Sequence, residues 1–369
     1  MSSAEPPAGF GSYPAEDVTF LVKDLGEVAL ERGTEDREQA IQAGRHYAQM
    51  LPVEYRPDPS YVALFTAALE RGAERLALAV GVVTELVLHE RPDPVLVSLA
   101  RAGTPVGVLL RRWAAFRHGL DLRHYSISIV RGRGIDRNAV RYVLDRHDGA
   151  RVQFVDGWTG KGAIARELTA AVRGGRLPVD DRLAVLADPG HCAPLYGTRD
   201  DFLIPSACLN STVSGLVSRT VLNDELIGPD DFHGAKCYRE LLAEDVSLWF
   251  VDAVCAAFPA VRAQVDADWP VLAGADRAPT WAGWRAVEAV AAEYGVEDLN
   301  LVKPGVGETT RVLLRRVPWR ILIDPARRDG LEHVLHLAAA RGVPVEEHHG
   351  LTYSCIGLIR PLSRPGRAA

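Results

Sequence analysis

Short apolar runs alternate with Gly-rich loops and amphipathic stretches between residues 92 and 190. Four runs have the length and composition of buried strands: Val95–Leu99, Tyr125–Val130, Val152–Asp156 and Leu183–Ala187. Each of the first three is followed by a loop and then by a stretch with helical spacing of its apolar residues. Strands that alternate with helices are typical of a parallel sheet covered by helices. The pattern therefore predicts an α/β fold with a doubly wound sheet.

The rest of the chain is divided by changes in composition. Residues 1–16 are rich in Pro, Gly and Ser, which favours a flexible lead-in. Residues 17–258 would form the α/β domain, and its first part, 17–90, is expected to be helical. Residues 259–295 are interpreted as a linker with one helix. Residues 296–369 would form a small α/β domain that includes a strand at Thr310–Arg315.

Charge is distributed unevenly along the 369 residues. The chain has 42 Lys and Arg against 48 Asp and Glu, a formal net charge of −6, which argues against bulk electrostatic binding of nucleic acid. From Glu297 onward the net charge is +3, so the first 296 residues carry −9. This change of sign indicates an appended module with a different partner.

Composition also limits the class of protein. The 47% hydrophobic content suffices for a sizeable core. No run of about 18 apolar residues occurs, which predicts no transmembrane helix and no membrane partner. Residues 1–11 lack the basic and apolar segments of a signal peptide. The five cysteines form no CxxC pair, so we expect a reduced, cytoplasmic chain without a zinc module.

The loop Asp156–Gly162 carries the strongest chemical signal. An acid ends an apolar strand, and a Thr- and Gly-rich loop leads into a helix, where backbone N–H groups can surround an anion. A nucleotide P-loop is excluded because Val155 would have to be Gly and Gly162 would have to be Ser or Thr. A tight strand-to-helix turn is the alternative interpretation. The candidate phosphate ligands are Thr159, Gly160, Lys161 and Gly162.

A second small-residue loop follows the strand Val95–Leu99 and contains Arg101, whose guanidinium can bind phosphate oxygens in a forked geometry. In a parallel sheet both loops emerge at the same edge, where ligands bind. Two anion loops at one edge suit a ligand with phosphate at both ends. The alternative is that Arg101 is a surface residue beside an ordinary turn.

These two loops resemble those of the type I phosphoribosyltransferases. The resemblance implies a type I phosphoribosyltransferase-like sheet that binds phosphoribosyl pyrophosphate (PRPP). Arg101, Ala102 and Gly103 would hold pyrophosphate, and the loop Asp156–Gly162 would hold the ribose and the 5-phosphate. A mobile loop carrying Arg131 and Arg133 would close over the site. Asp156 and Arg101 would be the catalytic residues.

The sequence departs from that family at Gly157, where a second acid is usual. Binding of ribose or of Mg²⁺, the implied cofactor, would then rest on Asp156 with help from Asp188. The Ser- and Thr-rich segment 205–218 offers further hydroxyls, although such runs are often solvated loops. The candidate acceptor-binding residues are Asp188, Asn210, Ser211, Thr212 and Ser214.

Longer stretches are similar to a bacterial stress-associated family linked to tellurite-resistance gene clusters. They are Tyr13–Lys23, Val97–Pro105, Phe154–Ile164, Ile204–Ser218 and Asn300–Ile359. That family joins a phosphoribosyltransferase domain to a C-terminal pelota-type RNA-binding domain, whose fold is related to kink-turn RNA binders. Some of its members carry the label "cysteine protease".

The resemblance implies possible contact with RNA through the C-terminal domain. A basic, aromatic cluster there could follow a phosphate backbone and stack a base, although a solvated strand edge explains Arg315 and Arg316 equally well. The candidate residues are Arg315, Arg316, Trp319 and Arg320.

Two cysteines are candidate nucleophiles. Cys192 follows His191, and Cys208 lies in the Ser- and Thr-rich segment. His191 and His233 are the candidate bases. A thiolate needs a nearby imidazole and an oxyanion hole. Neither cysteine lies in a known protease signature, so buried structural cysteines are the favoured interpretation.

The sequence therefore favours a PRPP-dependent phosphoribosyltransferase, a glycosyltransferase that joins an unidentified base-like acceptor to the ribose and releases pyrophosphate. It would serve the synthesis of a nucleoside-like metabolite in a stress or tellurite response, as a homo-oligomer. Two alternatives stay open, a non-catalytic sensor of nucleotide and RNA and a cysteine protease.

Overall fold

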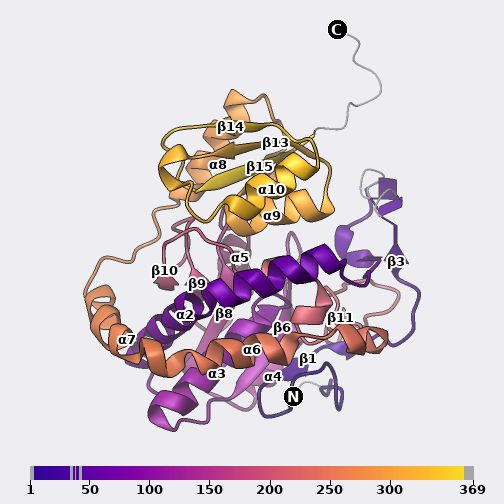
Figure 1. The fold of residues 1–369 in the computed structure, drawn as a ribbon. Coiled ribbons are helices and arrows are strands. Elements are labelled where there is room, and N and C mark those ends of the chain that lie inside the picture. The colour runs from indigo at the N-terminus through magenta and orange to yellow at the C-terminus, as the bar shows by residue number, and fades with distance from the viewer. Residues whose placement is uncertain (1–3, 34–35, 38, 41–43, 361–369) are drawn as a thin grey trace.

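The computed structural model describes residues 4–33, 36–37, 39–40 and 44–360, which form a larger α/β domain and a smaller C-terminal domain (Figure 1). The central sheet of the larger domain has the order β1-β6-β5-β8-β9-β10, and all neighbours in this order are parallel. Its strands are β1 (Thr19–Leu21), β5 (Val95–Ala100), β6 (His124–Val130), β8 (Val152–Trp158), β9 (Leu183–Ala187) and β10 (Leu195–Thr198). A short strand, β7 (Gly134–Ile135), pairs antiparallel with β6. The prediction of an α/β fold with a parallel sheet is confirmed.

The strand order identifies the edge at which a ligand would bind. Counted from β5, the order β6-β5-β8-β9-β10 is 2-1-3-4-5, a doubly wound arrangement. Its direction of winding reverses between β5 and β8. Ligands of such sheets bind outside the carboxyl ends of the strands at this reversal. Asp156 lies near the end of β8, and the loops that carry Arg101 and Thr159–Gly162 leave the sheet at that point.

Helices cover both faces of the sheet and bury it. One face packs against α2 (Pro59–Glu90), α3 (Thr104–His118), α6 (Ser247–Ala256) and α7 (Phe258–Ala273). The other face packs against α4 (Arg137–Leu144) and α5 (Ala163–Gly175). Because both faces are buried, the strands are nearly continuous apolar runs. Trp113 of α3 is fully buried against α2 and α7, and its indole nitrogen donates a hydrogen bond to Glu85 at 2.8 Å.

The N-terminal region differs from the helical prediction. Before α2, the described part of residues 17–58 contains short strands, and β1 joins the central sheet. The other short elements are β2 (Lys23–Asp24), which pairs with β11 (Gly234–Ala235), and β3 (Glu31–Arg32), which pairs with β4 (Leu51–Pro52). Phe10 and Tyr13, from the segment expected to be a flexible lead-in, are instead buried. The apolar run Thr19–Val22 finds a partner strand, which a helical interpretation of the region could not anticipate.

The smaller domain has a mixed four-stranded sheet of order β12-β15-β13-β14. Its strands are β12 (Val302–Pro304), β13 (Pro318–Ile323), β14 (Val345–Glu347) and β15 (Cys355–Ile359). Helix α8 (Ala282–Glu293) packs on one face, and α9 (Val306–Arg315) and α10 (Glu332–Ala340) pack on the other. The strand predicted at Thr310–Arg315 is wrong, because these residues belong to α9. Val306, Thr310 and Leu313 recur at helical spacing and are buried.

The segment expected to be a linker is shared between the two domains. Helix α7 packs along α2 in the core of the larger domain, and α8 belongs to the core of the smaller one. Residues 274–281 connect them. Single-turn 3₁₀ helices occupy several other loops: η1 (Tyr47–Gln49), η2 (Gly149–Arg151), η3 (Pro205–Ala207), η4 (Ser211–Val213), η6 (Leu299–Leu301) and η7 (Pro325–Arg327). A longer one is η5 (Arg239–Glu244). Among the described residues, none of the helices has the length and apolar character needed to cross a membrane.

Candidate functional site

The smaller domain is seated on the carboxyl edge of the central sheet. Asp201, which follows β10, accepts hydrogen bonds from the backbone N–H groups of Val306 at 2.9 Å and Ser354 at 2.8 Å. The hydroxyl of Tyr61 in α2 donates to the carbonyl of Leu314 at 2.7 Å. The candidate site therefore lies where the two domains meet.

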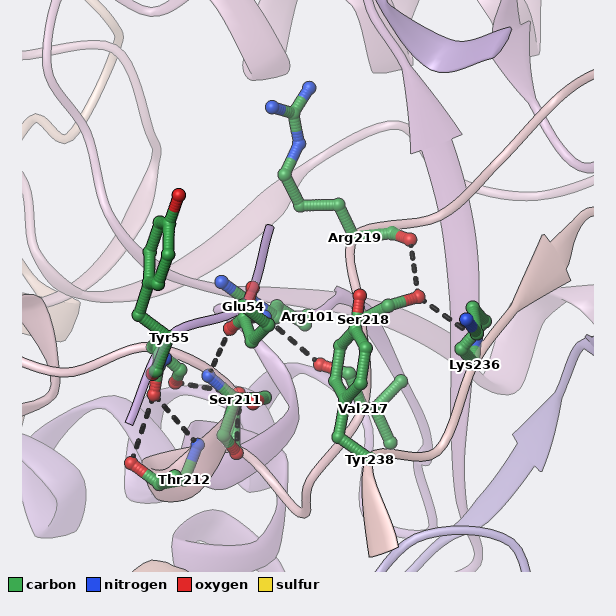
Figure 2. Close-up of polar contacts among 12 residues, drawn as sticks. Glu54, Tyr55, Arg101, Ser211, Thr212, Val217, Ser218, Arg219, Lys236 and Tyr238 are labelled. Carbon is green, nitrogen blue, oxygen red and sulfur yellow. Dashed lines mark hydrogen bonds and ion pairs between the residues drawn. The ribbon is translucent and has the colours of Figure 1, made fainter. Parts of the chain in front are cut away.

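Arg101 lies at the point where the sheet reverses its winding and is tied down inside the larger domain. Its Nη1 donates to Glu54 Oε1 at 2.8 Å and to the carbonyl of Val217 at 3.1 Å (Figure 2). Glu54 Oε1 also accepts the backbone N–H of Ser211 at 2.6 Å. The Glu54 side chain is only 4% exposed. Arg101 thus has one acidic partner before any ligand is considered.

The loop after β8 is in contact with the smaller domain. The carbonyl of Gly160 accepts the hydroxyl of Tyr353 at 3.1 Å, and the Lys161 ammonium donates to the carbonyl of Leu299. The hydroxyl of Thr159 donates to Asp188 Oδ1 at 2.6 Å. Gly162 has φ +78°, which favours glycine. The phosphate-binding role expected for this loop stays a prediction, and in this conformation its polar groups serve the domain interface.

Two carboxyl groups in this region have shifted pKa values: Asp188 is fully buried and Asp156 is partly buried. Burial raises the pKa of Asp156 to about 7, although the N–H of Gly157 donates to its Oδ1 at 2.8 Å. Burial likewise raises the pKa of Asp188 to about 6. Among the described residues, no group of three or more His, Cys, Asp or Glu side chains is placed to hold a metal ion. The Mg²⁺ site expected at Asp156 stays a prediction.

The expected acceptor-binding residues fall into two separate places. Asn210, Ser211, Thr212 and Ser214 form one turn beside Glu54, whereas Asp188 binds Thr159 and the backbone N–H of Cys192 instead. In the turn, Asn210 donates to the carbonyl of Tyr55 at 2.7 Å and accepts the Thr212 hydroxyl at 3.0 Å. Figure 2 shows the turn below Glu54, on the side of Tyr55.

Arg131 and Arg133 lie on the tight connection between β6 and β7. Glu167 accepts the N–H groups of Gly132 at 2.7 Å and Gly134 at 2.9 Å, which holds this connection to α5. The backbone N–H of Arg131 donates to the hydroxyl of Tyr47 at 2.8 Å. The role of this segment as a mobile closing loop stays a prediction.

The expected RNA-binding residues point to different neighbours. Arg320 stacks on Trp319 at 4.2 Å and pairs with Glu346 at 2.5 Å. Arg315 Nη2 instead donates to the carbonyl of Cys208 in the larger domain at 3.1 Å. Arg316 follows Arg315 at the end of α9 and acts electrostatically on Arg219. The RNA-binding role expected for these four residues stays a prediction.

Sequence reasoning missed Arg219, which lies beside Arg101. Its guanidinium lies 5.0 Å from the centre of the Tyr47 ring, and Arg101 is among the charges that act on it. Glu54 and Tyr47 were missed as well. No local pattern marks these residues, because each acquires its neighbours from segments more than 45 residues away in the chain.

All five cysteines are free thiols. Burial raises the pKa of Cys192 and of Cys208 to about 12. The charge of Asp188 also raises the pKa of Cys192, whereas the guanidinium groups of Arg315 and Arg311 act to lower that of Cys208. Among the described residues, none of the imidazoles is hydrogen-bonded to a cysteine sulfur. His233, one of the candidate bases, is instead bonded to Ser128 at 2.8 Å.

Comparisons with known proteins place the chain in one family. Residues 11–255 match the family described as "Tellurite-like stress resistance cysteine protease StiP", and residues 281–361 match the "PELOTA RNA binding domain". A protein of Acinetobacter baylyi named "Cysteine protease StiP" is 37% identical over 352 residues, which cover 91% of this chain and 90% of that protein. No solved structure matches the chain.

These findings correct the function expected from the sequence. Both the family and the Acinetobacter protein are named as cysteine proteases, which are hydrolases, so PRPP-dependent glycosyl transfer with release of pyrophosphate is contradicted. The same names overturn the transferase description and the low rank given to the protease alternative. The suspected family and its pelota domain are confirmed. The chain belongs to the StiP family of tellurite-like stress-resistance cysteine proteases.

Proposed function

We propose that this chain is a thiol-dependent peptidase. The observation that carries the proposal is the family match together with a relative of that name aligned over about nine-tenths of both chains. In the proposed reaction a cysteine thiolate attacks a peptide carbonyl carbon. The C–N bond breaks, the amine leaves with a proton, and water then hydrolyses the thioester and restores the thiol.

Cys208 is the nucleophile that the electrostatics favour. Two guanidinium groups, those of Arg315 and Arg311, act on its thiol and stabilise the negative form. Reactive cysteines are found in such electropositive surroundings. The negative charge of Asp188 instead raises the pKa of Cys192. The Cys192 thiol donates to the carbonyl of Gly190 at 3.1 Å. Cys192 is therefore held as a neutral thiol.

Burial sets a condition on this reaction. Cys208 is fully buried, and its pKa of about 12 keeps it protonated near neutral pH in this conformation. Catalysis would require a conformation in which the thiol reaches solvent and a base. The rate of alkylation by iodoacetamide, compared with that of the half-buried Cys255, measures how often this opening occurs.

The test is hydrolysis of a fluorescently quenched casein by the full chain. Cys208→Ala and Cys208→Ser should each lower the rate by at least 100-fold, whereas Cys192→Ala and Cys255→Ala should keep it. Thermal melting of each variant separates lost chemistry from lost folding. If the wild-type chain is inactive on a broad set of peptides, or if all five Cys→Ala variants retain activity, the peptidase proposal is wrong.

RNA binding by the smaller domain is a second candidate function. The match to the pelota domain supports it, and so does the partly exposed stack of Arg320 on Trp319, which places a cation beside an aromatic ring. Base stacking on such faces is a common mode of RNA recognition. Trp319→Ala should weaken the binding of a single-stranded RNA by about 1–3 kcal/mol, measured by fluorescence anisotropy. Unchanged binding would show that the Trp319 ring does not stack an RNA base.

We also propose that the larger domain shares the fold of the type I phosphoribosyltransferases, without their activity. The parallel sheet with its reversal between β5 and β8 supports this. We infer a cytoplasmic location from the five free cysteines, which suit a reducing compartment. An experimental structure compared with solved enzymes of that fold, and fractionation of cells that produce the protein, would test these two points.

A further inference from the structure

The smaller domain covers the carboxyl edge of the central sheet, where ligands of doubly wound folds bind (Figure 1). After β8, the Tyr353 hydroxyl donates to the carbonyl of Gly160 at 3.1 Å. Gly307 of α9 lies against the Trp158 indole, since a Cβ on this glycine would be only 3.3 Å from the ring. The Arg311 guanidinium lies 4.8 Å from the centre of the same ring. Segments of the chain itself therefore lie over the end of β8.

The same domain also covers the segment that contains Cys208. Helix α9 packs against η3, the single turn that precedes Cys208. Arg315, the last residue of α9, donates from Nη2 to the carbonyl of Cys208 at 3.1 Å. The carbonyl of Leu314 accepts the hydroxyl of Tyr61 at 2.7 Å, which ties the same end of α9 to α2. The Cys208 side chain is 0% exposed, so in this arrangement its sulfur is out of reach of solvent and substrate.

The contacts between the domains are of a kind that can open without unfolding either one. Among the described residues, the apolar clusters of the smaller domain take in one side chain from the larger domain, that of Leu203. Each domain thus keeps its own core. The hydrogen bonds described above all have a main-chain group as one partner, and water can replace such a bond once the domains part. Domains joined by polar contacts of this kind are expected to move relative to each other.

Asp201 fastens the smaller domain at the start of α9. Its carboxylate accepts the N–H groups of Val306 at 2.9 Å and of Ser354 at 2.8 Å, and its carbonyl accepts the Ser354 hydroxyl at 3.3 Å. Hydrogen bonds to an ionised acceptor are stronger than those between neutral groups. The connection between the domains, residues 274–281, is mostly exposed and runs along one side of the molecule (Figure 1). Opening would turn about this connection and break the bonds of Asp201.

We propose that the smaller domain is an autoinhibitory cap, latched by Asp201, that must lift from the sheet edge before the thiol of Cys208 can react. The reaction of the thiol with a peptide rests on the peptidase function proposed above, whereas the covering of Cys208 by the cap does not. The closed arrangement is the resting state of the chain. Activity then depends on the fraction of molecules in which the cap is open.

Alkylation of Cys208 by iodoacetamide, followed by mass spectrometry on the full chain, measures how often the cap is open. Asp201→Ala removes the acceptor of two hydrogen bonds and should raise the alkylation rate about 10-fold. Tyr61→Phe removes one bond and should raise it about 3-fold. Asp200→Ala and Tyr55→Phe, at exposed positions, are the matched controls and should react as the wild type does. Alkylation of Asp201→Ala at the wild-type rate, or an equal rise in Asp200→Ala, would overturn the proposal.

Urea separates lifting of the cap from unfolding of the chain. Lifting exposes little surface, so the alkylation rate of Asp201→Ala should change by less than about 2-fold between 0 and about 1 M urea. Reaction through global unfolding would rise by about 5-fold or more over the same range. A rise as steep as that would mean that the variant exposes its thiol by unfolding, which contradicts a cap.

Casein hydrolysis keeps the cap and the peptidase proposals distinguishable. If Cys208 is the nucleophile, Asp201→Ala should hydrolyse casein faster than the wild type, by about the factor of its faster alkylation. Faster alkylation without hydrolysis by any form of the chain would support the covering of Cys208 and refute the peptidase. Hydrolysis that depends on Cys208, combined with unchanged alkylation in Asp201→Ala, would support the peptidase and refute the cap. Hydrolysis at the wild-type rate despite faster alkylation would show that closure does not inhibit.

Discussion

The carboxyl group of Asp201 should make the stability of this chain depend on pH through the domain interface. Burial raises its pKa from the ordinary 3.8 to about 6, although the N–H groups of Val306 and Ser354 favour the ionised form. The native state therefore holds this proton more tightly than the unfolded chain does. The stability that comes from this proton is complete below pH 3.8 and is lost as the pH rises to about 6 and beyond.

The size of the effect follows from the width of that window. One pKa unit corresponds to about 1.36 kcal/mol, so between pH 4.5 and pH 7 Asp201 should lower the free energy of unfolding by about 2 kcal/mol. Asp201→Asn removes this titration. The substitution also leaves one backbone N–H facing an amide NH₂ group, which lowers the free energy of unfolding by about 1–3 kcal/mol at every pH. The variant should therefore be clearly less stable than the wild type at pH 4.5 and close to it at pH 7.

Urea unfolding at half-unit steps from pH 4.5 to pH 7 measures this difference. The neighbouring Asp200 is the matched control, because its side chain is 65% exposed and pairs with Arg75 at the surface. Asp200→Asn should run parallel to the wild type. If the curves for Asp201→Asn and the wild type are also parallel, Asp201 does not titrate in this window and the reasoning about its burial fails.

Three further changes test other contacts. Gly162→Ala should lower the free energy of unfolding by about 3 kcal/mol in thermal melts, because φ is +78° and a Cβ would lie 2.6 Å from the Cys192 sulfur and from a ring carbon of Trp281. Gly174→Ala is the control: its Cβ would meet open space, so the change should be neutral or slightly stabilising. Tyr353→Phe should cost about 1 kcal/mol through loss of the bond to the Gly160 carbonyl, and an unchanged melting temperature would contradict that bond. Arg219→Met should change the melting temperature little, because the side chain is only partly buried and pairs with no described carboxylate; a clear drop in melting temperature would show that Arg219 has a partner.

The central sheet could be predicted from sequence because its strands are buried on both faces. The runs at Val95–Leu99 and Leu183–Ala187 are apolar at almost every position, and loops and helices follow the strands in the order of a parallel fold. Helix α9 was mistaken for a strand because its β-branched residues favour strands locally. Packing decides otherwise, since Gly357 of β15 leaves room for the helix, with the Thr309 backbone close to it.

The candidate site was less accessible to sequence reasoning. Arg101 could be found because its loop follows a recognisable strand at the edge where ligands bind. Glu54 could not, since its role depends on Arg101 and Ser211, which are distant from it in sequence. The function was mistaken for a different reason. Loops that suit phosphate were read as evidence of a reaction, although a fold and its anion-binding loops do not determine the chemistry.

The position of the smaller domain links the two halves of the chain thermodynamically. Three hydrogen bonds hold it against the sheet edge: Tyr353 with Gly160, Leu299 with Lys161, and Val306 with Asp201. Arg315 of the smaller domain donates to the carbonyl of Cys208, so exposure of the Cys208 thiol requires this arrangement to open. Contacts that hold the two domains together should therefore oppose reaction at the thiol.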